Sequence, residues 1–71
     1  MYELAAKNFE EAIKEKPVFD AEKKDLVYNL GSVLEVMDKK DEAIKQFIQI
    51  YEVDSSYKDV QAKVDKYYGA Q

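Results

Sequence analysis

A short apolar pattern occurs twice in this chain, and it limits the folds that the chain can adopt. Each copy has alanine, then phenylalanine, then an aliphatic residue at spacing i, i+4, i+7, which places the three side chains on one face of a helix. The copies lie 38 residues apart and comprise Ala5, Phe9 and Ala12, and then Ala43, Phe47 and Ile50. A repeat with a period in this range predicts stacked helical units, which usually act by presenting a surface.

The composition favours one small helical domain. The chain has 71 residues, of which 37% are charged and 46% are hydrophobic, so it is too apolar for a disordered chain. Only two glycines and one proline interrupt it, and cysteine and histidine are absent. Without cysteine, neither a disulfide nor a thiolate metal site can stabilise a domain of this size.

Charge and hydropathy argue against two classes of partner. The net charge of −4 does not fit a nucleic-acid interface, which needs a clustered basic face. No apolar run approaches the roughly 20 residues of a membrane span, and no secretory signal follows Met1. We therefore expect no nucleic-acid partner, no membrane insertion and, by default, a cytoplasmic location.

Apolar periodicity predicts about four helices and no strand. The segments are 2–16, then a helix that follows Asp20 as its N-cap, then a helix that starts at residue 40 or 41 and ends near 53, and finally 56–69. Pro17 should stop the first helix. Ser56 with Asp59 resembles a capping box for the last helix, and Gly69 fits a C′ residue. Short loops should make successive helices antiparallel, so the predicted fold class is all-α with helix-turn-helix repeats.

Gly31 lies within the apolar stripe of the second helix. A glycine inside a helix costs about 1 kcal/mol relative to alanine. We expect a neighbouring helix to approach so closely here that a β-carbon would block it.

Two segments in the middle of the chain are typical of one protein family. Tyr28-Asn-Leu-Gly31 lies on one expected helix, and Asp41-Glu-Ala-Ile44, followed by Phe47, lies on the next. Together they resemble the tetratricopeptide repeat (TPR), whose first helix carries Leu-Gly and whose second carries Ala-x-x-x-Phe. The resemblance implies one TPR-like domain over 1–71, with a half repeat at 2–16, a full repeat at 20–54 and a capping helix at 56–69. It also implies that Ala43 faces Gly31.

The chain departs from the family pattern at four positions. Val27 and Leu34 replace the usual aromatic residues, which keeps the core apolar but weakens the match. Asp38 occupies a turn position where glycine is common, and Ser55 stands where the proline that ends a repeat is expected.

The resemblance also suggests a partner-binding groove on the second helix. Its residues would be Asp25, Tyr28, Asn29, Ser32 and Glu35, while Tyr51, Tyr57 and Tyr67 fall on core stripes. A solvated helix face also explains these groove residues, and it is the simpler interpretation. Family members that hold the carboxylate terminus of heat-shock chaperones need lysine and asparagine on their groove helices, and here only Asn29 fits. An acidic groove would favour a basic or neutral peptide of a partner protein.

Catalysis is not expected from these residues. The carboxylates of Glu10 and Glu11, or of Asp41 and Glu42, are helix neighbours and point about 100° apart, so they do not converge as an acid and base. The serines have no histidine to activate them, and no calcium loop or phosphate loop is present. We expect a non-enzyme without metal or cofactor.

The unpaired half repeat supports a second hypothesis. Leu4, Phe9 and Ile13 belong to a helix whose usual partner helix is missing from the chain, so an apolar face would stay bare. Two or more copies could cover it by self-association, or the chain could be a piece excised from a longer array. A free-standing bundle without a ligand is a third reading.

Overall fold

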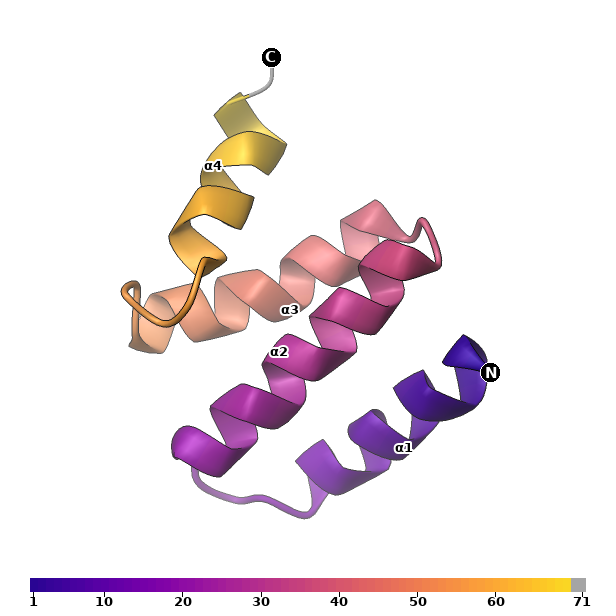
Figure 1. The fold of residues 1–71 in the computed structure, drawn as a ribbon. Helices are drawn as coiled ribbons and strands as arrows, with labels where there is room; N and C mark the ends of the chain where they lie inside the picture. The colour runs from indigo at the N-terminus through magenta and orange to yellow at the C-terminus, as the bar shows by residue number, and fades with distance from the viewer. Residues whose placement is uncertain (70–71) are drawn as a thin grey trace.

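The computed structural model describes residues 1–69, and these residues form four α-helices with no strand (Figure 1). The helices are α1 (Tyr2–Lys14), α2 (Ala21–Val36), α3 (Lys40–Val53) and α4 (Val60–Gly69). The all-α prediction is confirmed. The first helix ends at Lys14 rather than Lys16, because Pro17 disfavours the helical conformation in the residue before it.

Each helix packs against its neighbours in the sequence. α1 lies on α2, α2 on α3, and α3 on α4, and Figure 1 shows α1 and α4 on opposite sides of the α2–α3 pair. The result is a flat body with Cα extents of 35 × 27 × 14 Å. Nearest-neighbour packing of this kind leaves an open side on each terminal helix.

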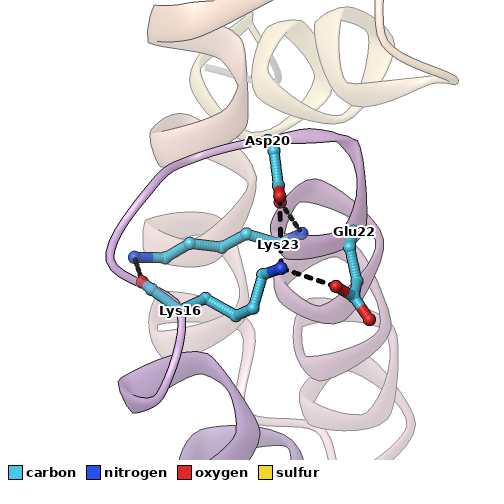
Figure 2. A network of polar contacts seen from close by, with 4 residues as sticks. All are labelled: Lys16, Asp20, Glu22 and Lys23. Carbon is cyan, nitrogen blue, oxygen red and sulfur yellow. Dashed lines mark hydrogen bonds and ion pairs between the residues drawn. The ribbon is translucent and has the colours of Figure 1, made fainter.

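The connection between α1 and α2 is held by a local polar network (Figure 2). One carboxylate oxygen of Asp20 accepts the backbone N–H of Lys23 at 2.9 Å, which confirms Asp20 as the N-cap of α2. The Lys16 ammonium lies 3.1 Å from the other oxygen of Asp20 and 2.5 Å from Glu22. These contacts raise the pKa of Lys16, mainly through Glu22, and the Lys23 amide, followed by Lys16, lowers the pKa of Asp20. The network fixes the direction in which the chain enters α2.

The core lies mainly between α2 and α3. Its buried residues are Ala6, Val27, Leu30, Leu34, Ala43, Ile44, Phe47, Ile50 and Val60. Complete burial of a residue such as Phe47 or Ile50 contributes about 1.5–3 kcal/mol. All three members of the second copy of the repeated pattern are buried, whereas those of the first copy, on α1, are only half-buried. The two copies differ because α3 has a neighbour on each side and α1 has only α2.

Close packing at Gly31 is confirmed, but its neighbour is not the expected one. A β-carbon built on Gly31 would lie 2.7 Å from Cζ and 2.8 Å from Cε1 of Phe47. The facing group is therefore the edge of the Phe47 ring on α3 rather than Ala43.

The turn between α2 and α3 explains the aspartate at a position where glycine is common. Asp38 has φ 61°, in the left-handed region. Its N–H donates to the carbonyl of Glu35, and the N–H of Lys39 donates to that of Leu34, both at 2.9 Å. This is the Schellman arrangement, and aspartate tolerates the left-handed conformation better than most residues do.

The start of α4 differs from the prediction. Ser56 does not cap a helix, because residues 57–59 form a turn and the helix starts later; its N–H and its hydroxyl both donate to the Asp54 carboxylate. The chain instead turns through Lys58, which has φ 42°, and α4 begins at Val60. The backbone carbonyl of Asp59 accepts the N–H of Lys63, which makes Asp59 the residue that precedes the helix.

The end of α4 also differs. Gly69 is the last residue of the helix and does not have a positive φ, so it is not a left-handed C′ residue.

Candidate functional site

The five residues predicted to form a groove lie along α2. Asp25, Asn29 and Glu35 are exposed, and Tyr28 and Ser32 are half-buried. Three of the five contact side chains from the segment that joins α3 to α4 and from the first turn of α4. Much of the predicted groove therefore faces residues of the same chain.

These contacts are polar. The Tyr57 hydroxyl donates to the Asp25 carboxylate, and the Tyr28 hydroxyl donates to Asp59 at 2.6 Å. The Lys63 ammonium lies 3.0 Å from the Glu35 carboxylate. Asp25, Tyr28 and Glu35 thus act as anchors for the 57–63 segment.

An ion pair between Lys24 and Asp54, at 3.1 Å, fixes the start of the same connection. Asp54 also accepts the Ser56 hydroxyl, and the hydrogen bond from Ser56, followed by that from Lys24, lowers the pKa of Asp54. The connection is therefore held to α2 at both of its ends.

Tyr28 is at the centre of these contacts. Its ring meets the rings of Phe47 and Tyr57 edge-on, with centroids 5.5 and 6.0 Å away, and the Lys58 ammonium lies 4.9 Å above it. The hydrogen bond to Asp59, together with burial, raises the pKa of Tyr28 to about 12. The phenol is therefore held protonated as a donor, with a structural role in docking the segment before α4.

A cleft opens beside this contact region, and we call it the α3–α4 cleft. It has a volume of about 400 Å³, and its floor is formed by Ala43, Ile44 and Phe47 of α3. The ring of Tyr67 on α4 lines one side. Four charged residues complete the lining: Glu35, Lys40, Lys63 and Lys66.

The charge of the cleft is positive, although the whole chain is acidic. Glu35 is paired with Lys63, which leaves Lys40 and Lys66 to set the local charge. The Lys40 ammonium is 3.9 Å from the Asp38 carboxylate, and both side chains are about four-fifths exposed, so this contact is weak. Lys66 has no ion pair within residues 1–69. The cleft therefore differs in charge from the acidic groove predicted on α2, because three lysines line it and its one acidic residue, Glu35, is paired with Lys63.

Of the residues that line the cleft, only Glu35 was predicted as a groove residue. The lysines were not predicted because they lie on α3 and α4 rather than on α2. One signal was available, since Lys63 falls on the stripe formed by Val60, Val64 and Tyr67, which faces the rest of the domain. Tyr67 was expected in the core, but it is 37% exposed at the edge of the cleft, and its hydroxyl donates to Asp41.

The three residues predicted for self-association do not form one exposed face. Phe9 and Ile13 are half-buried and pack against the core, and only Leu4 is exposed. Ala6, which the predicted stripe omitted, is the buried residue of α1. The exposed apolar residues at the start of α1 are Met1, Tyr2 and Leu4, and Val18 is exposed beyond its other end.

Two kinds of feature are absent from the part of the chain that the structure describes. Residues 1–69 contain no group of three or more acidic residues placed to hold a metal ion. Within the same residues, no helix has both the length and the apolar character needed to cross a membrane. The cleft lining supplies ammonium groups, one carboxylate, a phenol and apolar carbon, all of which suit noncovalent recognition.

No protein-family model, curated protein or solved structure shows a significant match to this chain.

Proposed function

We propose that this protein is a non-catalytic interaction module that binds a peptide segment of a partner protein in the α3–α4 cleft. The observation that carries the proposal is the cleft itself, which has an apolar floor, a tyrosine at its side and lysines at its rim. Ligand sites usually combine apolar walls with a few polar groups in this way.

The arrangement of the helices supports the same reading. Packing between sequence neighbours is typical of helical repeat arrays, which bind partners along open surfaces. Tyr28-Asn-Leu-Gly31 and Asp41-Glu-Ala-Ile44 lie on the antiparallel pair α2 and α3, as the TPR resemblance implies. These features make a peptide or helix of another protein the natural class of ligand.

Two neighbouring tyrosines provide a matched test. Tyr67 lines the cleft and Tyr68 does not, although both are exposed on α4. A displayed library of random peptides would be selected on the wild-type protein, and the selected peptides would then be measured on Tyr67→Ala and Tyr68→Ala. We expect binding to be lost on Tyr67→Ala and kept on Tyr68→Ala. Failure to select any peptide, or equal binding to both variants, would contradict the proposal.

Self-association is a second candidate, and the exposed apolar end of the molecule favours it. Met1 is 90% exposed, Tyr2 55% and Leu4 51%, and α1 has only α2 as a neighbour. Apolar residues gathered at the start of α1 invite a second copy.

Leu4 is the residue that tests self-association cleanly, because Phe9 and Ile13 also support the fold. Light scattering over a range of concentrations should show an assembly that Leu4→Glu dissociates. The control is Val36→Glu on α2, which places the same charge at a site of similar exposure. A wild-type monomer at every concentration would exclude this candidate.

A further inference from the structure

We infer that the α3–α4 cleft selects an acidic peptide segment that carries one large apolar side chain. This inference rests on the proposed function and names the chemistry of its ligand. It is drawn from the positions of Lys40, Lys63 and Lys66 around an apolar floor.

The rim of the cleft carries positive charge from two helices. Lys40 is the first residue of α3, and Lys66 lies in the last turn of α4, so the two ammonium groups come from different helices at the rim of one cleft. Lys63 is paired with Glu35, Lys40 has only a weak, exposed contact with Asp38 at 3.9 Å, and Lys66 has no ion pair within residues 1–69. Two cations that are weakly paired or unpaired beside a cleft complement carboxylates spaced along a ligand.

The floor of the cleft is apolar. Ala43, Ile44 and Phe47 are almost completely buried, so the ligand would meet them only at the bottom of the cleft. The sides are formed by the partly exposed ring of Tyr67 and the aliphatic stem of Lys63, whose ammonium lies 5.1 Å from the centre of the Phe47 ring. Such walls suit one aromatic or branched side chain placed between the two cations.

A nucleic acid would also bring negative charge, but the observations favour a peptide. The lysines form one local cluster on a chain with a net charge of −4, rather than a basic stripe that could follow a phosphate backbone. Asp38, Asp41 and Glu42 lie beside Lys40 and would repel a polyanion that extends past the cleft. A short segment that ends within the cleft meets less of that repulsion.

The test uses the intact chain and the fluorescent synthetic peptide Glu-Asp-Glu-Phe-Glu-Asp-Glu, measured by anisotropy at low salt. Comparison peptides replace Phe with Ala, or replace every acidic residue with Lys, and a single-stranded oligonucleotide serves as a fourth ligand. The variants are Lys40→Glu/Lys66→Glu and, as a matched control with the same change in net charge, Lys7→Glu/Lys14→Glu on the exposed side of α1. Lys40→Gln/Lys66→Gln removes the same cations without introducing repulsion, and circular dichroism checks that each variant is folded.

We expect the acidic Phe peptide to bind most tightly. Loss of two partly exposed ion pairs should weaken it about fivefold in Lys40→Gln/Lys66→Gln and more in the Glu variant, with little change in the α1 control. Added salt should weaken it further. Tighter binding of the lysine peptide or the oligonucleotide, or equal loss in the α1 control, would overturn the inference and leave peptide binding itself open to other sequences. Binding of none of the peptides, with no peptide selected from the library, would overturn the proposed function as well.

Discussion

The contact between Gly31 and Phe47 permits a prediction in which the sign of a mutational effect depends on a second residue. Gly31→Ala would place a β-carbon 2.7 Å from Cζ of Phe47. This is roughly 1 Å closer than the separation of roughly 3.5–4.0 Å at which two carbon atoms attract. The Phe47 ring is only 1% exposed, so it has little room to move away.

Two opposing terms set the magnitude. Alanine is a better helix former than glycine by about 1 kcal/mol, whereas forcing extra volume into a packed core costs about 1–3 kcal/mol. We therefore expect Gly31→Ala to lower the free energy of unfolding by about 1 kcal/mol. In a Phe47→Leu background the ring edge is absent, so the same change should raise the free energy of unfolding by a few tenths to about 1 kcal/mol.

The assay is a double-mutant cycle by urea denaturation, followed by circular dichroism. For a domain of this size, a change of 1 kcal/mol corresponds to a shift of roughly 4–8 °C in Tm, which is easily measured. The coupling energy between the two positions should be at least about 1 kcal/mol. An equal effect of Gly31→Ala in both backgrounds would refute the argument that the Phe47 ring requires glycine.

Three further predictions concern Val60 on α4, Tyr28 in the middle of α2 and Asp20, the N-cap of α2. Val60 is completely buried, so Val60→Ala should cost about 2 kcal/mol and speed amide hydrogen exchange in α4 more than in α2. Because the bond to Asp59 raises the pKa of Tyr28 above its value of about 10 in the unfolded chain, this bond stabilises the fold below pH 10, and its contribution is lost as the pH rises toward 12. Urea denaturation in that range should show a smaller loss of stability for Tyr28→Phe than for the wild type. Asp20→Ala should lower Tm by removing the acceptor for the Lys23 amide, whereas Asp20→Asn should retain most of the stability.

The parts of the fold that depend on local spacing were predictable from the sequence. The stripe through Val27, Leu30 and Leu34 gave α2, and Ala43, Phe47 and Ile50 gave the facing side of α3. Both follow from the 3.6-residue period of the helix, which needs no knowledge of tertiary structure. Asp20 was also recognisable, because an N-cap acts on the backbone only three residues away.

The boundaries that failed were decided by competition between residues. Ser56 has the spacing of a capping residue, but its N–H and its hydroxyl both donate to the carboxylate of Asp54, two residues before it. This local turn competes with helix formation at Ser56. Glycine is the residue most often found at the C′ position, but a glycine does not have to adopt the left-handed conformation, and Gly69 does not.

The candidate site was harder to predict because it combines residues from three helices. The TPR resemblance drew attention to α2, and the acidic residues there gave an acidic groove. Asp25 and Glu35 are in fact engaged by Tyr57 and Lys63 from the other end of the chain. Which side chains compensate one another depends on how α4 packs, and a sequence pattern does not contain that information.

The central claim, that the α3–α4 cleft binds a peptide, is tested most directly by two-dimensional NMR. The ¹⁵N-labelled protein would be titrated with the acidic Phe peptide, and the shifted amides would be mapped on the fold. We expect saturable shifts concentrated at Lys40, Ile44 and Lys66, with α1 unaffected. Saturable shifts centred on α1, or no shifts either with this peptide or with any peptide selected from the library, would contradict peptide binding in the cleft.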